Sequence, residues 1–431
     1  MKTITKSIYQ MKNCIEPGLE RAAFGNQWPC YTNVSLTANN HVNKRVQGLA
    51  QWRLSFLLLA GFLFGPLQLS ASDCVAFFKV GPFEVGGQPL HMVTADVNGD
   101  GQLDLVIPNA VTGVVVLAGD GTGQFSGPTY PAGVYPHDVA VGDFNGDGKP
   151  DLAVAAGIGG NGAGVEVLLN NGDGTFSAPT LYPAENDPSQ IVAADFNGDG
   201  KLDLAVTDNI SGNVDILLGT GTGAFGLPAQ FPGTATPTGI AVGDFNGDGK
   251  LDLVIANYAT QDLRILQGDG NGNFTTIHTY PVGSGNSGNP SEVAIGDFNR
   301  DGREDLAVGV HNVLPPGNDH IAIYQGNGDG SFTAGQRIRV GDPAGLVVAD
   351  LNRDGNLDIA VATYLDNNVT VMLGSGNGKF GVPSVFPLGN FAGLPFDVVT
   401  GDFNDDGKPD LALVDYANGT VVVGIGRSCS H

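Results

Sequence analysis

Short apolar segments alternate with polar, glycine-rich stretches along the chain from about residue 77 onward. Segments such as IAVGD at residues 240–244 and DLAV at residues 203–206 alternate large apolar positions with small or polar ones, which is typical of β-strands. A second phrase, LLGTGTGAF at residues 217–225, predicts a third strand, a glycine-rich turn and a phenylalanine that opens a fourth strand. The pattern therefore predicts a unit of four strands, with an acidic loop between the first and the second.

That acidic loop reads D-x-N-x-D-G-x-x-D and recurs seven times. Its copies start at Asp96, Asp143, Asp195, Asp244, Asp297, Asp350 and Asp402. A period near fifty residues, with four antiparallel strands in each period, is typical of propeller blades. The sequence therefore predicts an all-β fold, a seven-bladed β-propeller of four-stranded antiparallel blades.

The two ends of the repeat region are incomplete in complementary ways. The last copy stops after its third strand, VVVGIG at residues 421–426, whereas FFKVGPFEVG at residues 77–86 resembles an isolated fourth strand. We expect the N-terminal strand to complete the last blade, which closes the ring and removes an exposed strand edge. The phenylalanine of each glycine-rich phrase is expected to pack between neighbouring blades.

The acidic loop has the chemistry of an oxygen-rich metal site. Side chains at positions 1, 3, 5 and 9, with the carbonyl of position 7, would supply the oxygens that Ca²⁺ prefers, and Gly at position 6 permits the sharp turn. Mg²⁺ suits such a crowded loop less well. An EF-hand would need a glutamate at position 12, where this chain has apolar residues such as Ile107 and Val154. Ordinary turns also favour Asp, Asn and Gly, but seven copies without substitution at five positions favour calcium.

We therefore expect about seven calcium ions, one per blade, with a structural role. The predicted ligands are the residues at positions 1, 3, 5, 7 and 9 of each copy: Asp96, Asn98, Asp100, Gln102, Asp104, Asp143, Asn145, Asp147, Lys149, Asp151, Asp195, Asn197, Asp199, Lys201, Asp203, Asp244, Asn246, Asp248, Lys250, Asp252, Asp297, Asn299, Asp301, Arg303, Asp305, Asp350, Asn352, Asp354, Asn356, Asp358, Asp402, Asn404, Asp406, Lys408 and Asp410.

Composition and charge narrow the class of protein. The chain has 66 Gly among 431 residues and is 42% hydrophobic, which favours a turn-rich β protein with a sizeable core over a disordered chain. Its formal net charge of −24 argues against a nucleic-acid partner, because nucleic-acid binders carry basic patches.

Residues 1–72 differ from the rest, since they contain more basic than acidic residues and no copy of the repeat. After Arg53, the stretch LSFLLLAGFLFGPLQLSAS at residues 54–72 has an apolar core at about 54–69 and ends in small residues, as a cleavable secretory signal does. The leader is therefore expected to be removed. The mature chain, residues 73–431, is expected to be secreted or held at the cell surface, without a membrane span.

Two alternative interpretations of the leader are disfavoured. A membrane anchor would be interrupted by Gly61, Gly65 and Pro66 within a short apolar run. A lipoprotein signal would need a small residue before its cysteine, but Asp73 precedes Cys74.

The cysteines fit an exported propeller. Cys74 lies just before the isolated N-terminal strand and Cys429 just after the final strand, so both correspond to the same turn of an intact repeat. We predict a Cys74–Cys429 disulfide across the closure. Cys14 and Cys30 lie in the leader.

The calcium phrase and the glycine-rich phrase together resemble the FG-GAP/VCBS repeat family, over about residues 77–426. This resemblance implies the calcium-binding seven-bladed propeller of integrin α-subunits and of related secreted microbial proteins and fungal lectins. The last three copies depart from the usual glycine at position 4, where they have Arg300, Arg353 and Asp405. That position provides no ligand side chain, so calcium binding is still expected.

The calcium loops and glycine-rich turns should share one face of the propeller, and the remaining loops should form a variable face. Polar and aromatic residues on that second face are typical of sites for sugars or peptide side chains. The predicted ligand-binding residues are Asn109, Asn209, Asn257, Tyr258, His311, Tyr364 and Tyr416. Nearby loops add His91, Tyr135, His137, Phe391 and Phe396.

The leading hypothesis is a binding or adhesion module for an extracellular glycan or protein. A propeller-type polysaccharide lyase or related carbohydrate-active enzyme is an alternative, although the chain contains no G-x-S-x-G elbow, zinc signature or phosphate loop, and we assign no catalytic residue. A structural spacer is a second alternative. A lyase would shorten its polymer, whereas a binding module would release it unchanged.

Overall fold

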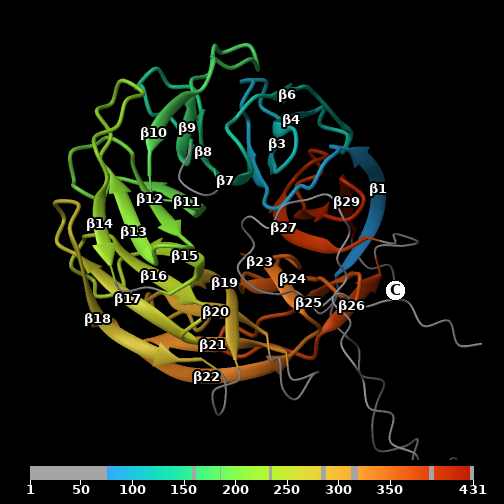
Figure 1. Cartoon of the computed structure of the whole chain (residues 1–431). Coiled ribbons are helices and arrows are strands. Elements are labelled where there is room, and N and C mark those ends of the chain that lie inside the picture. The colour runs from blue at the N-terminus through green and yellow to red at the C-terminus, as the bar shows by residue number, and fades with distance from the viewer. Residues whose placement is uncertain are drawn as a thin grey trace, which may run out of the picture. The chain divides into compact units, whose positions relative to one another are not determined.

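The computed structural model describes residues 75–157, 162–184, 186–232, 235–282, 288–311, 319–387 and 393–427. All of these belong to one compact unit, Leu69–His431. They form seven antiparallel sheets arranged in a ring, and no helix occurs among them (Figure 1). The prediction of an all-β, seven-bladed propeller is confirmed.

Each blade runs outward from an innermost strand. Blade 1 contains β2 (Val93–Ala95), β3 (Asp104–Asn109), β4 (Gly113–Gly119), β5 (Phe125–Ser126) and β6 (Thr129–Tyr130); blade 2 contains β7 (Pro136–Gly142), β8 (Asp151–Ala156), β9 (Gly164–Leu168) and β10 (Thr180–Pro183); blade 3 contains β11 (Pro188–Ala194), β12 (Asp203–Asp208), β13 (Asn213–Leu217) and β14 (Ala229–Pro232). Blade 4 contains β15 (Pro237–Gly243), β16 (Asp252–Asn257), β17 (Asp262–Gly268) and β18 (Phe274–Pro281); blade 5 contains β19 (Asn289–Gly296), β20 (Asp305–His311), β21 (His320–Gly326) and β22 (Phe332–Arg339). Blade 6 contains β23 (Pro343–Ala349), β24 (Asp358–Thr363), β25 (Asn368–Met372) and β26 (Ser384–Pro387); blade 7 contains β27 (Pro395–Gly401), β28 (Asp410–Asp415), β29 (Thr420–Arg427) and β1 (Ala76–Glu84).

The innermost strands surround a central channel. In chain order β2, β7, β11, β15, β19, β23 and β27 each contact the next, and β27 contacts β2 again. The second strand of every blade is buried along its whole length, because neighbouring blades cover both of its faces.

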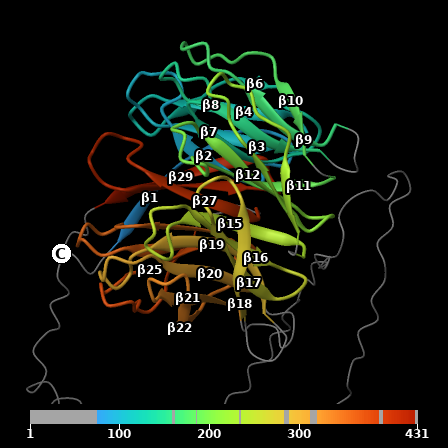
Figure 2. The ribbon, with the colours of Figure 1, turned by 90° about the vertical axis from the view of Figure 1, so that its left-hand side faces the viewer.

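The N-terminal strand completes blade 7, as predicted. β1 pairs antiparallel with β29, in a register that runs from Ala76 opposite Arg427 to Glu84 opposite Thr420. The two strands lie side by side in both views (Figure 1, Figure 2). Blade 7 therefore joins the two ends of the described chain.

Proline sets the length of the outer strands. β18 and β22 begin at the phenylalanine of the glycine-rich phrase and run without interruption for eight residues. In the other four blades with this phrase, a proline follows three residues after the phenylalanine, at Pro128, Pro179, Pro228 and Pro383. Because proline has no N–H to donate, the phenylalanine there forms only a short strand or an isolated bridge, and regular pairing resumes beyond the proline.

In five of the six glycine-rich phrases that contain a phenylalanine, this ring packs edge to face on the phenylalanine at position 2 of the acidic loop in the preceding blade. The ring centroids are 5.2–5.6 Å apart in the pairs Phe144–Phe225, Phe196–Phe274, Phe245–Phe332, Phe298–Phe380 and Phe403–Phe125. Each pair joins two consecutive blades, so the predicted packing between neighbouring blades is confirmed.

The leader and the predicted disulfide between Cys74 and Cys429 lie outside the described residues, as does Phe391. Within the described ranges, a helix long and apolar enough to cross a membrane is not found.

Candidate functional site

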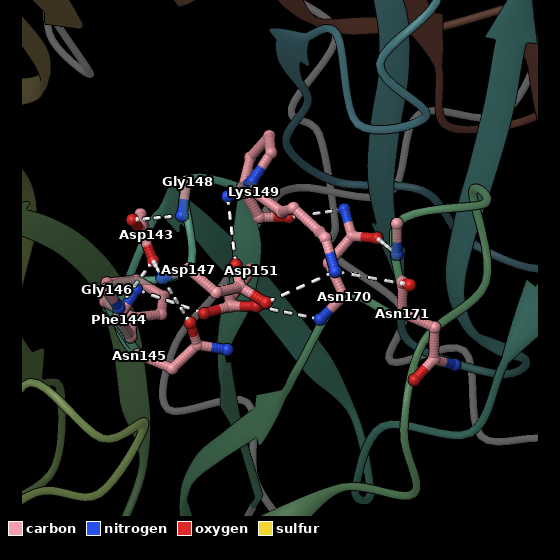
Figure 3. A network of polar contacts seen from close by, with 12 residues as sticks. Asp143, Phe144, Asn145, Gly146, Asp147, Gly148, Lys149, Asp151, Asn170 and Asn171 are labelled. Carbon is pink, nitrogen blue, oxygen red and sulfur yellow. Dashed lines mark hydrogen bonds and ion pairs between the residues drawn. The ribbon is translucent and has the colours of Figure 1, made fainter.

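Each acidic loop connects the first and second strands of its blade and folds around its first aspartate. In blade 2, Asp143 Oδ1 accepts hydrogen bonds from the backbone N–H groups of Gly146 and Asp147, at 2.7 and 3.1 Å, and Oδ2 accepts one from Gly148 at 2.8 Å (Figure 3). Asn145 Oδ1 accepts a further bond from Asp147, at 2.8 Å. The loop thus brings the oxygens of positions 1, 3 and 5 together.

The aspartate at position 9 anchors the loop to the blade. Asp151 is fully buried, and it accepts backbone hydrogen bonds from Phe144 at 3.0 Å and from Asn170 at 2.7 Å (Figure 3). The same two contacts, one to position 2 and one to the end of the third strand, recur in all seven copies. Position 9 therefore has a structural role beside any role as a ligand.

The electrostatics of the loops suit a cation. Burial raises the pKa of the position-9 carboxyl in every copy, to about 6 for Asp252, Asp358 and Asp410, and nearby carboxylates of the same loop raise it further. Carboxylate oxygens that accept one N–H bond keep a second lone pair. Three carboxylates and an amide oxygen per loop fit a hard divalent cation such as Ca²⁺, which takes only oxygen ligands.

Position 4 has the same backbone conformation with or without glycine. Gly99 has a φ of 76°, and the non-glycine residues Arg300, Arg353 and Asp405 have φ values of 61°, 61° and 55°. The loop therefore imposes a left-handed conformation that is unfavourable for a side chain. The Asp405 carboxylate accepts a 2.9 Å hydrogen bond from the Gln102 amide, which links the loops of blades 7 and 1.

Three of the residues predicted to bind a ligand hold the variable face together. Asn109 and Asn257 are fully buried. The Asn109 side chain bonds to backbone groups of the adjacent loops, and the Asn257 amide donates to Asp262 Oδ1 at 2.9 Å. Asn209 bonds to the side chain of Asp187. Tyr258 is partly exposed in blade 4.

Two other predicted residues meet in an aromatic cluster that we call the Phe396 cluster, formed by His91, Tyr364, Phe396 and Tyr416. The Phe396 ring lies 5.7 Å from His91, 6.0 Å from Tyr364 and 5.9 Å from Tyr416, between ring centroids. All four residues are partly exposed. The cluster joins blades 6, 7 and 1 on the variable face.

The last predicted residue, His311, is buried at the end of β20 and contacts Asp342 through Nδ1. His311, Asp319 and Asp342 each offer one atom that could bind a metal, and these three atoms lie within 4.8 Å of one another. One imidazole and two carboxylates can hold a divalent metal, and they can equally form a hydrogen-bonded ion pair without one.

The structure also places a ring of seven residues, five of them polar, around the channel, and of these only His91 was named from the sequence. It occupies the second position after a proline at or just before each innermost strand: His91, Asp138, Gln190, Gly239, Glu292, Gly345 and Asp397. We call these seven positions the polar ring. The recurring proline is the sequence signal that could have identified them. The polar ring lies at the end of the innermost strands opposite the acidic loops.

Contacts within the polar ring link blade to blade. Asp138 Oδ2 accepts a hydrogen bond from the backbone N–H of Ile191 at 3.0 Å, and Gln190 Oε1 accepts one from Ile240 at 2.9 Å. The Gln190 amide also donates to Glu292 Oε2 at 3.0 Å, reaching from blade 3 to blade 5 past Gly239. The polar side chains therefore converge on the channel.

Burial dominates the electrostatics of the polar ring. It raises the pKa of Glu292 to about 7 and that of Asp397 to about 6. The imidazole of His91 acts in the opposite direction and lowers both pKa values by a smaller amount. Burial opposes the charged form of His91, but the carboxylates of Asp138, Asp397 and Glu292 together raise its pKa. The four ionisable groups, those of His91, Asp138, Glu292 and Asp397, are thus electrostatically coupled.

Next to the polar ring, on the side toward the acidic loops, the innermost strands line an open cavity of about 540 Å³. Its lining comes from β2, β7, β11, β15, β19 and β23 and consists of Val, Ile, Leu and Ala residues. Cavities of this size with a mainly apolar lining are typical of ligand sites, and the adjacent polar ring provides the polar groups that such sites also need.

Comparison with known proteins identifies the repeat. The model of the FG-GAP-like repeat matches residues 96–154, 143–206, 195–255, 244–308, 312–361 and 350–413. No curated protein matches the sequence.

Solved structures share the fold at low sequence identity. BBS1N, crystallised in complex with ARL6DN, is 16% identical with a TM-score of 0.57, over 81% of this chain and 97% of that one. A protein from Lactobacillus plantarum is 11% identical with a TM-score of 0.54, over 73% and 91% of the two chains. The periplasmic gluconolactonase PpgL of Pseudomonas aeruginosa is 14% identical with a TM-score of 0.53, over 72% and 95%. The repeat matches span most of the sequence, and the chain belongs to the FG-GAP-like repeat family.

Proposed function

We propose that this protein is an exported, calcium-binding propeller that binds a glycan or protein partner at or outside the cell surface. The observation that carries the proposal is the Phe396 cluster beside the polar ring. Partly exposed aromatic rings provide apolar faces for stacking, and the phenol, imidazole and carboxylate groups around them can orient a polar ligand.

Calcium is proposed to hold the opposite face of the propeller. Each loop gathers carboxylates that repel one another in the absence of a cation. The raised pKa of the position-9 carboxyl reflects its burial first and then this repulsion. About seven ions would neutralise these groups and fix the loop between the first and second strands of each blade. Export is proposed from the apolar, cleavable pattern of residues 54–72.

The test is binding of the purified protein, with calcium present, to an array of polysaccharides and glycans and to candidate surface proteins. We expect binding that Tyr364→Ala and Tyr416→Ala each weaken by about tenfold. Phe78→Ala is the control, because Phe78 is an exposed aromatic residue on the outer strand β1, outside the Phe396 cluster. Equal binding by all three variants would contradict the proposed site.

The bound ligand should also be examined for cleavage. A ligand recovered intact supports the binding module, and a shortened polymer supports the alternative enzyme. The carboxyls of Glu292 and Asp397, with pKa values of about 7 and 6, would then be the first candidates for proton transfer.

A further inference from the structure

Two rings of side chains follow one another along the channel. The polar ring is the first. The second lies two residues further along each innermost strand and contains only valine and alanine. Six of its members line the cavity of about 540 Å³: Val93, Ala140, Val192, Ala241, Ala294 and Val347. We call the polar ring the mouth of the channel and the ring of valine and alanine its throat. A polar mouth therefore leads into an aliphatic throat.

The mouth is anionic and reachable by solvent. Three carboxyl groups, those of Asp138, Glu292 and Asp397, face one imidazole, that of His91. The side chains of His91 and Asp397 are 20% and 13% exposed to solvent, and His91 Nδ1 lies 3.9 Å from Asp397 Oδ2. Desolvated carboxylates are stabilised by a cation, and an acidic protein attracts cations from solution.

Two carboxylates of the polar ring flank a position that has no side chain. Blades 5 and 7 contribute Glu292 and Asp397, and blade 6 between them contributes only Gly345. A Cβ atom at Gly345 would lie 2.4 Å from Asp397 Oδ1, so a side chain there would collide with the carboxylate. The neighbouring Gly239 leaves the other side of Glu292 without a side chain except for the Gln190 amide.

We propose that the channel binds a small organic cation with an aliphatic body, a primary alkylammonium. Its ammonium group lies between Glu292 and Asp397, and its chain extends into the throat. The order of the two rings favours this ligand over a lysine side chain of a partner protein. A lysine entering from the variable face would place its methylenes in the polar mouth and its ammonium group in the aliphatic throat.

The experiment is calorimetric titration of the calcium-loaded protein with butylammonium, pentylammonium and hexylammonium. Each methylene buried in the throat should tighten binding by roughly fourfold. Hexanol and hexanoate test the requirement for the positive charge, and both should bind at least about tenfold more weakly than hexylammonium. The same affinity for all three alkylammonium ions, or binding of hexanol as tight as that of hexylammonium, would overturn the proposal.

Variants locate the two ends of the ligand. Glu292→Gln and Asp397→Asn should each weaken hexylammonium by about tenfold, whereas Glu84→Gln, on the exposed outer strand β1, should not. Ala294→Leu narrows the throat and should weaken hexylammonium more than butylammonium. Unchanged affinity in folded Glu292→Gln and Ala294→Leu proteins would contradict the proposed site. This ligand is separate from the macromolecular partner, so failure here leaves the function proposed above standing, and a blank glycan array leaves this inference standing.

Discussion

The backbone N–H of Met92 donates a 2.9 Å hydrogen bond to Oδ2 of Asp397, a residue 305 positions further along the chain. The bond joins the innermost strands of blades 1 and 7, where the ring closes. Equivalent bonds join blade 2 to blade 3 and blade 3 to blade 4. One repeat position therefore provides both a link between blades and the polar lining of the channel.

Removing this acceptor should weaken the closure. Asp397→Ala removes the acceptor of the buried Met92 N–H, at a cost of about 1–3 kcal/mol in the free energy of unfolding. Asp397→Asn keeps one acceptor oxygen and should cost less. Chemical denaturation in the presence of calcium measures the difference, and equal stability of the two variants would show that the bond does not matter.

Removal of calcium should lower stability. A single site held at about a hundred times its dissociation constant contributes about 2.7 kcal/mol, so even partial loss from seven loops should lower the melting temperature clearly. Thermal melts with and without a chelator measure the effect. Calcium should restore the curve better than magnesium, because the loops offer a crowded set of oxygen ligands. Superimposable melts would rule out the structural role.

The raised pKa of Glu292 makes stability depend on pH. Since the folded protein holds this proton up to a pKa of about 7, and a free glutamate only to about 4.5, the folded state binds more protons between those values. Stability should therefore fall as the pH rises from about 4.5 to 7. Glu292→Gln should flatten that slope in calcium-saturated protein, whereas Glu84→Gln should not. Parallel pH profiles for the wild type and Glu292→Gln would contradict the assignment.

The register of β1 and β29 sharpens the disulfide prediction. The described pairing of the two strands ends at Ala76 opposite Arg427, and in the sequence Cys74 and Cys429 each lie two residues beyond that pair. Cross-strand neighbours are close enough for a disulfide. We expect neither thiol to react with a probe in the folded, oxidised protein, and we expect Cys74→Ser to lower stability by as much as roughly 5 kcal/mol, since the bridge closes a very long loop. Labelling of both thiols in the native protein would exclude the bridge.

The number of blades, the closure by the N-terminal strand and the packing of phenylalanines between blades could be predicted from the sequence alone. Each depends on a pattern that is complete within one repeat of about fifty residues. The oxygen-rich loop is encoded in nine consecutive residues, and strand alternation and proline positions act over even shorter distances. Repetition makes such local signals readable, because seven copies distinguish a site from an ordinary turn.

The channel was decided by the tertiary structure. His91 and Asp397 are about three hundred residues apart, and only the ring brings their side chains within 3.9 Å. The same applies to Gln190 and Glu292, which meet because Gly239 between them has no side chain. Asn109 and Asn257 were predicted to bind a ligand, but the tertiary structure buries both side chains, where they form hydrogen bonds within the fold. Sequence pattern gives the type of residue at each repeat position, whereas the closure of seven blades around one axis decides which of those residues meet.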